Sequence, residues 1–205
     1  MSNPHATRPY MPGYGILGPN EGRGLLPWSW AEERLTTSHD YWVATVWPDG
    51  RPHVMPVWGI WNDESVWFSS SLQSRKARNL RADPRCVVTT DNPTEPVVVE
   101  GVAEVVRDLA AIQEMVSRVN EKYASDITLE FMDPDVNATF RVRQRWVFSL
   151  NLTDGASPSP RLGVASPLAH QPSANSFITQ SGSPCSDGAP HHRGAAGDCL
   201  QSPAG

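Results

Sequence analysis

Residues 41–59 read Tyr41-Trp-Val-Ala-Thr-Val-Trp-Pro-Asp-Gly-Arg-Pro-His-Val-Met-Pro-Val-Trp-Gly59, and this stretch decides the fold. Aromatic and β-branched residues dominate its first seven positions, which favours a strand. Pro48-Asp-Gly50 has the composition of a tight turn. A second strand follows over residues 52–61, and Asn62-Asp-Glu-Ser65 is the next turn. The stretch therefore predicts an antiparallel hairpin.

The flanking sequence continues this pattern. Further strands are expected at residues 66–70, 85–90, 97–107 and 140–152, and helices at 30–37, 74–81 and 108–124. Ser29 and Glu32 fit a capping box for the first helix. Six antiparallel strands with few helices predict a mainly β fold, a closed or partly open six-stranded barrel with flanking helices.

Composition divides the chain into three parts. Residues 1–24 are rich in proline and glycine and are expected to be a flexible arm. Residues 25–158 carry the strand and helix patterns and are expected to form the folded domain. Residues 159–205 are dominated by Ser, Pro, Gly and Ala, which predicts a disordered tail because few apolar groups are available to offset the ordering entropy.

Charge and cysteine content exclude several classes of protein. The net charge of −5 argues against nucleic-acid binding, which needs a basic surface. No apolar run approaches the roughly 20 residues of a membrane span, and the N-terminus lacks the pattern of a signal peptide. The three cysteines are widely separated and indicate neither a disulfide framework nor a metal site. We therefore expect a cytoplasmic protein without nucleic-acid or membrane partners.

A candidate phosphate site lies where the strand ending in Ser69 and Ser70 leads to a helix that begins with Ser74, Arg75 and Lys76. Free N–H groups and the dipole at a helix N-terminus attract anions, and Arg and Lys add charge. Positive side chains at this end oppose the dipole unless an anion is bound there. A solvated basic helix face is the alternative interpretation.

The strand from His53 to Gly59 is the second candidate. Pro56 cannot donate a ladder hydrogen bond, so the strand is expected at an edge or opening, where free backbone groups could pair with a heterocycle. Trp58 could cover a flat ring, or it could belong to an ordinary core. His39 and His53 have no carboxylate partner at motif spacing, and we expect neither an essential catalytic side chain nor a metal site.

Tryptophan is concentrated in one region. Seven of the eight tryptophans lie between residues 28 and 67. Such large side chains need apolar cover, which is typical of a small β core, a dimer interface or a wall for a flat aromatic ligand. Composition leaves these three open.

The hairpin at residues 41–58, Trp67-Phe-Ser69 and Ser74-Arg-Lys-Ala-Arg-Asn-Leu80 together resemble the pyridoxamine 5'-phosphate oxidase-like split-barrel superfamily. The sequence is most similar to its actinobacterial branch, which uses FMN or the 8-hydroxy-5-deazaflavin coenzyme (factor 420). The resemblance covers about residues 25–152. It implies an FMN-binding split β-barrel, a homodimer with cofactor sites between the subunits, and hydride transfer.

The resemblance also implies a set of cofactor-binding residues. The strand lines the ring system, the two serines follow it in the site, and the Arg–Lys pair binds phosphate. The set comprises Val54, Met55, Pro56, Val57, Trp58, Gly59, Ser69, Ser70, Ser74, Arg75, Lys76 and Asn79.

Departures from the family pattern count against oxidation of vitamin B6 phosphates. Pro96 stands where the oxidases have a cofactor-contacting Gln, and Gly59 stands where they have a Lys. Their C-terminal Arg-Leu-Ala-Pro ending is also absent. We therefore expect a flavin- or deazaflavin-dependent oxidoreductase acting on an unknown small molecule. A non-catalytic carrier of FMN, deazaflavin or haem is one alternative, and the vitamin B6 phosphate oxidase is another.

The tail departs from the ending of similar sequences at Pro160 to Val164. One choice of codons for these residues encodes Arg-Ala-Trp-Val when read one base later. Residues 159–205 are therefore also considered as a frameshift product, with a genuine disordered tail as the alternative.

Overall fold

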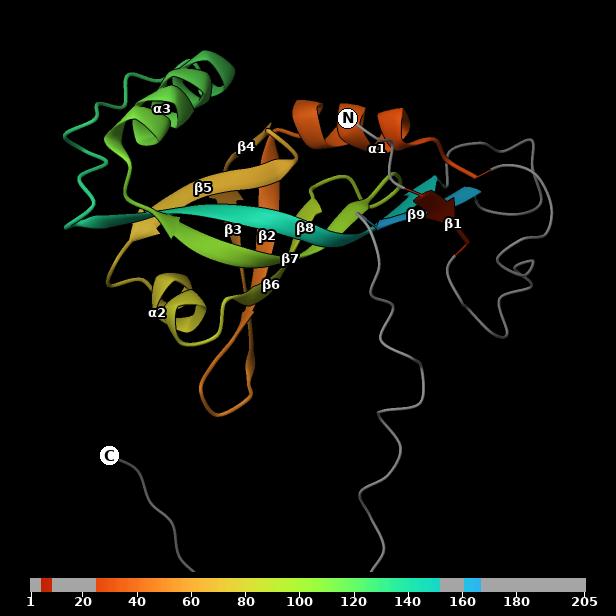
Figure 1. Ribbon diagram of the computed structural model, residues 1–205, viewed down its shortest axis with the longest axis horizontal. Helices are drawn as coiled ribbons and strands as arrows, with labels where there is room; N and C mark the ends of the chain where they lie inside the picture. The colour runs from red at the N-terminus through yellow and green to blue at the C-terminus, as the bar shows by residue number, and fades with distance from the viewer. Residues whose placement is uncertain (1–4, 9–24, 152–160, 167–205) are drawn as a thin grey trace, which may run out of the picture. The chain divides into compact units, whose positions relative to one another are not determined.

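The computed structural model of the chain describes residues 5–8, 25–151 and 161–166. These residues form three helices and nine strands (Figure 1). The helices are α1 (Trp28–Thr37), α2 (Arg75–Ala82) and α3 (Leu109–Tyr123). The strands are β1 (His5–Thr7), β2 (Asp40–Val46), β3 (Pro52–Trp58), β4 (Ile60–Asn62), β5 (Ser65–Ser71), β6 (Arg85–Thr90), β7 (Val97–Val106), β8 (Asn137–Asn151) and β9 (Arg161–Ser166).

The mainly β, antiparallel architecture is confirmed, but the strands outnumber the six predicted. The strand expected over residues 52–61 is two strands, β3 and β4, because the ladder breaks at Gly59. The other five predicted strands and all three helices appear within three residues of their predicted bounds. β1 and β9 are additional.

The sheet curves around without closing. From β8 the strand order runs through β7, β6 and β2 to β3, while on its other side β8 pairs with β5, which pairs with β4. Among the described strands, β3 hydrogen-bonds only to β2. The chain passes directly from β3 into β4, so β3 comes near β5 without pairing with it. This opening between β3 and β5 is the split of the barrel.

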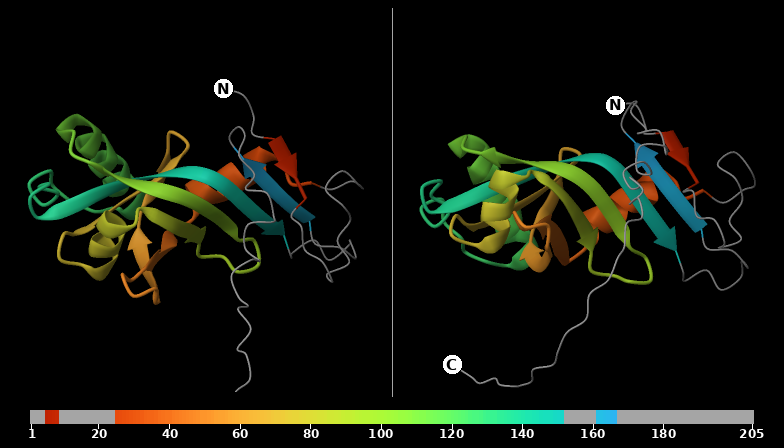
Figure 2. Two further views of the ribbon diagram at one scale, coloured as in Figure 1. Left: turned by 60° about the horizontal axis from the view of Figure 1, so that its bottom comes forward. Right: turned by 90° about the horizontal axis from the view of Figure 1, so that it is seen from below.

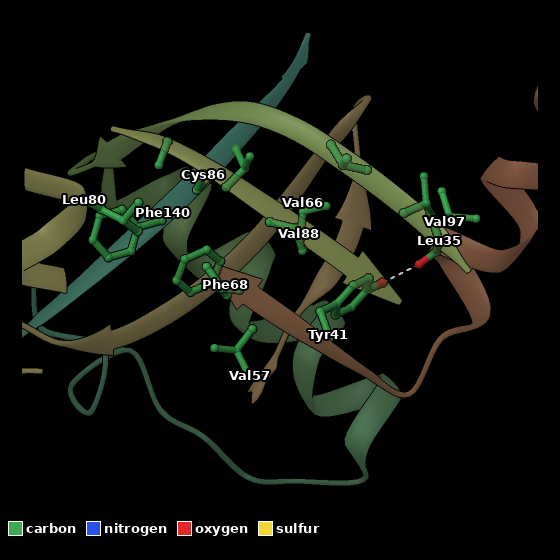
Figure 3. Close-up of a cluster of buried hydrophobic side chains, with 14 of the residues drawn as sticks. Leu35, Tyr41, Val57, Val66, Phe68, Leu80, Cys86, Val88, Val97 and Phe140 are labelled. Atoms are coloured by element: carbon green, nitrogen blue, oxygen red, sulfur yellow. Dashed lines mark hydrogen bonds between the residues drawn. The ribbon is translucent and has the colours of Figure 1, made fainter. Parts of the chain in front are cut away.

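The main core fills the inside of the curved sheet (Figure 3). Alternation along β2 buries Tyr41 and Val43 completely, as the period of a strand requires. The Tyr41 hydroxyl donates a hydrogen bond to the carbonyl of Leu35 at the end of α1, as the dashed line in Figure 3 marks. This bond satisfies a buried polar group and ties α1 to the barrel.

A second apolar cluster lies under α3. The apolar stripe of this helix, Ile112, Met115, Val116 and Val119, packs against Ile60 of β4 and Trp67 of β5. The segment after α3 adds Met132. The helix therefore covers the part of the sheet that lies beside the split (Figure 1).

The helix starts only partly match the sequence analysis. The capping box at Ser29 is wrong: α1 begins earlier, its N-cap is Pro27, and no side chain caps it. Ser29 consequently lies inside the first turn. Ser74 does cap α2, and Asp108 caps α3; each side chain accepts a hydrogen bond from the backbone N–H three residues on.

Two short strands occur in the segments expected to be flexible or disordered. β9 pairs with β8, and β1 pairs with β9, which extends the sheet at that end (Figure 2). The remaining parts of residues 1–24 and 159–205, and the frameshift hypothesis, lie outside the described residues. Over the described residues, no helix is long and apolar enough to cross a membrane.

Candidate functional site

A cavity of about 250 Å³ lies at the split of the barrel. β3 and β5 form two of its walls, the start of α2 forms one end, and α3 with the segment after it covers the top. The lining residues are Pro56, Val57, Trp58, Phe68, Ser69, Lys76, Met115, Val119, Ile127 and Met132. Five of them belong to the predicted cofactor-binding set, drawn from three separate elements.

The polar end of the cavity is built on the β5–α2 connection. Ser70 Oγ donates to Ser74 Oγ at 2.8 Å, and Ser74 Oγ accepts from the Ala77 N–H at 3.2 Å. In the part of the chain that the structure describes, the backbone N–H groups of Arg75 and Lys76 have no hydrogen-bond partner. The first turn of α2 therefore presents free donors to an anion.

Lys76 is the cation that lines the cavity. It forms no ion pair with any described carboxylate, and burial lowers the pKa of its ammonium below the ordinary value of 10.5. A partly buried cation without a carboxylate is costly. Its environment therefore favours an incoming anion.

Arg75 points away from the cavity lining. Its guanidinium lies 3.6 Å from the ring centroid of Trp47, at the β2–β3 hairpin, in a cation–π contact. Arg51 also contacts that ring, at 4.4 Å. Arg75 accordingly contributes positive charge beside the N-terminus of α2 while its side chain ties the helix to the hairpin.

β3 supplies the apolar wall. Because it pairs on one side only, alternate backbone N–H and C=O groups face the split, as at any sheet edge. Val54, Met55, Pro56 and Trp58 are exposed, whereas Val57 is buried and turned inward. The edge position expected from Pro56 is thus observed.

Seven residues of the predicted set do not line the cavity: Val54, Met55, Gly59, Ser70, Ser74, Arg75 and Asn79. Two of these, Gly59 and Asn79, are buried. Asn79 is only 1% exposed; its amide nitrogen donates to Thr45 Oγ1 at 3.0 Å inside the barrel. Gly59 is buried, and its backbone N–H and C=O are engaged by side chains of α3. The Asn79 amide nitrogen and both backbone polar groups of Gly59 are thus directed at other protein groups.

The sequence analysis did not predict the four lining residues that come from α3 and the segment after it. Met115 and Val119 belong to the apolar stripe of α3, which the sequence pattern assigned to core packing. Ile127 and Met132 lie in an irregular segment with no periodic signal. Only the tertiary fold brings these four over the opening.

A second cavity, of about 370 Å³, also adjoins α3. Its lining comprises Asn62, Asp63, Trp67, Ala111, Glu114, Met115 and Arg141. It is the larger of the two, yet it contains none of the predicted residues. Its only cation, Arg141, is paired with Glu104.

The fold defines a split-barrel protein, and the cavity at the split is its candidate binding site. The family model of pyridoxamine 5'-phosphate oxidase matches residues 31–150, more than half of the chain. The chain belongs to this family, and the resemblance noted from the sequence is confirmed at that level.

The chain is also similar to several solved structures. The conserved hypothetical protein Rv2991 from Mycobacterium tuberculosis is 25% identical, with a TM-score of 0.59 over 67% of this chain and 92% of that one. An F420 reductase is 26% identical, with a TM-score of 0.48 over 62% and 98%. General Stress Protein 26 from Bacillus anthracis is 15% identical, with a TM-score of 0.50 over 59% and 91%. Among curated proteins, none matches the chain.

Proposed function

We propose that this protein binds FMN or the 8-hydroxy-5-deazaflavin coenzyme at the split of the barrel and is an oxidoreductase that transfers hydride to or from a small molecule. One observation carries the proposal. A single cavity is lined by Lys76, which forms no ion pair with a described carboxylate, and by an apolar wall that includes Trp58. When bound, the cofactor supplies the redox chemistry, and the protein binds and orients it.

The phosphate end of such a cofactor suits the start of α2. Lys76 offers a point charge, Arg75 lies beside it, and two backbone N–H groups of the first helical turn are free. Ser69 and Ser70 supply hydroxyl groups at the end of β5, although each already donates one hydrogen bond within the protein. A phosphate would give the partly buried ammonium the counter-charge that it lacks.

The ring end suits the apolar wall. Pro56 and Trp58 line the slot, Met115 and Val119 cover it, and the free edge of β3 offers alternate backbone donors and acceptors. Flat heterocycles combine an apolar face with a polar edge, and the slot matches both properties.

The size of the cavity supports a homodimer. Pockets that bury a whole ligand measure roughly 300–1,000 Å³, so a cavity of about 250 Å³ encloses only part of a flavin. Beside it, β2 and β3 expose an apolar patch, here called the outer patch, made of Trp42, Val46, Val54, Pro56 and Trp58. We propose that a second copy of the chain covers this patch and completes the site.

Binding of FMN compared with riboflavin tests the phosphate site, because the two differ only in the phosphate. We expect wild-type protein to bind FMN more tightly by roughly 10-fold or more, the range for hydrogen bonds to charged groups. Lys76→Met should reduce FMN affinity toward that of riboflavin and leave riboflavin binding unchanged. Arg78→Met is the matched control, since Arg78 is exposed on the same helix. Equal affinity of the wild-type protein for both ligands would rule out the phosphate site.

Turnover is tested separately. The protein is loaded with reduced FMN or reduced deazaflavin coenzyme under anaerobic conditions and mixed with a panel of small organic electron acceptors. Reoxidation of the cofactor that depends on both protein and acceptor is the expected result. A protein that binds the cofactor with high affinity but transfers no hydride to any acceptor is a carrier, and the enzymatic part of the proposal is then wrong.

A further inference from the structure

Two side chains at the end of α3, those of Lys122 and Tyr123, hydrogen-bond to the backbone of Gly59, which lies between β3 and β4. The Gly59 N–H donates to Tyr123 Oη at 2.9 Å. The Gly59 carbonyl oxygen accepts from Lys122 Nζ at 2.9 Å and lies 3.1 Å from Tyr123 Oη. Both backbone polar groups of Gly59, which has left the β-ladder, are therefore satisfied by side chains of α3.

The same tyrosine packs against the wall of the cavity. The rings of Tyr123 and Trp58 stack with centroids 4.4 Å apart and an interplanar angle of 8°. His39 packs edge-on against Tyr123, and its carbonyl oxygen accepts from the Tyr123 hydroxyl. The tyrosine ring is thus fixed from three sides, and one face of the Trp58 indole rests on it. Trp58 nevertheless remains 49% exposed, so its other surface is available.

Lys122 anchors this arrangement to the core. Its ammonium donates to Tyr41 Oη at 3.3 Å and lies 4.6 Å from the centroid of the Tyr41 ring. Tyr41 is fully buried and bonded in turn to α1. Within the described residues, no carboxylate forms an ion pair with Lys122. Burying an ammonium without an ion-pair partner costs free energy. A lysine with no structural role would therefore extend its ammonium into solvent.

We propose that Lys122 and Tyr123 are positioning residues of the binding cavity: they fix the plane of the Trp58 indole, and through it they set the orientation of a planar ligand. The last part rests on the proposed function. Neither residue lines the cavity, so both act through the Trp58–Gly59 segment. A ligand ring on the free face of Trp58 would complete a stack of three aromatic layers on a rigid base.

The variants separate ring packing from hydrogen bonding. Tyr123→Phe keeps the ring and removes the hydroxyl, Tyr123→Leu removes both, and Lys122→Met keeps the aliphatic stem and removes the charge. Arg118→Met is the matched control, because Arg118 is an exposed cation one turn earlier on α3, paired with Glu114. Trp58→Leu identifies the spectroscopic signals that belong to this indole.

The first readout is the near-ultraviolet circular dichroism of the protein without cofactor. A fixed Trp58–Tyr123 stack should give a band that disappears in Trp58→Leu and in Tyr123→Leu. The band should persist in Tyr123→Phe and in Arg118→Met, and weaken in Lys122→Met. A Tyr123→Leu protein that is folded, with an unchanged melting transition, and retains the band would overturn the proposal whatever the protein binds.

The second readout is FMN binding. Tyr123→Leu should weaken FMN and riboflavin affinity equally, by roughly 2- to 10-fold, as expected from the loss of an aromatic pair. It should also reduce the visible circular dichroism of the bound flavin, and Tyr123→Phe should restore both. Unchanged affinity and flavin dichroism in Tyr123→Leu would overturn the effect on orientation. Absence of flavin binding by wild-type protein refutes the proposed function instead, and the first readout then decides whether Trp58 is positioned as stated.

Discussion

Gly59 and Trp67 approach so closely that a Cβ atom built on Gly59 would lie 2.8 Å from the carbonyl oxygen of Trp67. The same Cβ would lie 3.2 Å from the ring of Tyr41, which is completely buried. Neither neighbour can yield, because one is sheet backbone and the other is core. The position where the vitamin B6 phosphate oxidases carry a Lys is therefore closed to a side chain in this protein.

Gly59→Ala is expected to destabilise the protein by about 1–3 kcal/mol, the usual cost of overpacking a dense interior. The measurement is the free energy of unfolding by chemical denaturation. Gly50→Asn is the control: Gly50 has φ +88° but open space around its Cβ position, so it tests backbone conformation without a steric clash. Equal stability of Gly59→Ala and the wild-type protein would show that the β3–β4 junction can relax.

The strands and helices follow from local sequence, which explains why they could be predicted. A strand or helix with one buried face shows a regular spacing of apolar residues. This spacing is visible as alternation along residues 41–47 and as the apolar stripe from Ile112 to Val119. The break at Gly59 could not be predicted, because it depends on the carbonyl of Trp67, which another strand supplies.

The candidate site likewise has a part that local sequence predicts and a part that it does not. The β5–α2 connection carries its serines and basic residues within a few positions, so sequence alone indicates an anion site. Asn79 lies on the same helix, but the direction of its side chain depends on how the helix is rotated against β2. In the structure the side chain points inward and hydrogen-bonds to Thr45. Met132 reaches the cavity only through the path of an irregular segment, which no local pattern encodes.

The affinity for FMN should fall at alkaline pH because of Lys76. Burial lowers the pKa of this ammonium in the free protein, and a bound phosphate would raise it again. Binding therefore takes up a proton between the two pKa values, and affinity falls as the pH rises through the lower one. The ratio of FMN to riboflavin affinity is the quantity to measure, since both share the titrating ring. In Lys76→Met the ratio should not change over the same alkaline range.

The outer patch should control the oligomeric state. Val54 lies directly opposite Ala44 of β2, and Trp42 lies opposite Pro56, so these side chains share one face of the sheet. Val54→Glu places a charge in the centre of this face and should convert a dimer to monomers, as measured by light scattering after size exclusion. Val105→Glu is the matched control on β7, where the valine is 43% exposed outside the patch. Val54→Glu protein that remains dimeric would place the interface elsewhere.

Lys122 should impose a pH dependence on stability. Burial lowers the pKa of Lys122 to about 8, although Asp40 and Asp91 act in the opposite direction. The neighbouring hydroxyls of Tyr41 and Tyr123 are neutral in this range, because burial raises both of their pKa values, that of Tyr123 to about 12. In the unfolded chain the Lys122 pKa returns to about 10.4. Between these values the unfolded chain binds the extra proton, so stability rises with pH.

Lys122→Met removes this contribution. From pH 8 to 10 the free energy of unfolding of the wild-type protein should rise relative to that of Lys122→Met, and below pH 8 the difference should be constant. Because the side chain is only partly buried, solvent screens the effect and the slope should be shallow. Arg118→Met, which keeps Lys122, should follow the wild-type curve in parallel. A difference between wild type and Lys122→Met that stays constant from pH 8 to 10 would mean that the ammonium keeps its ordinary pKa and is not desolvated by burial.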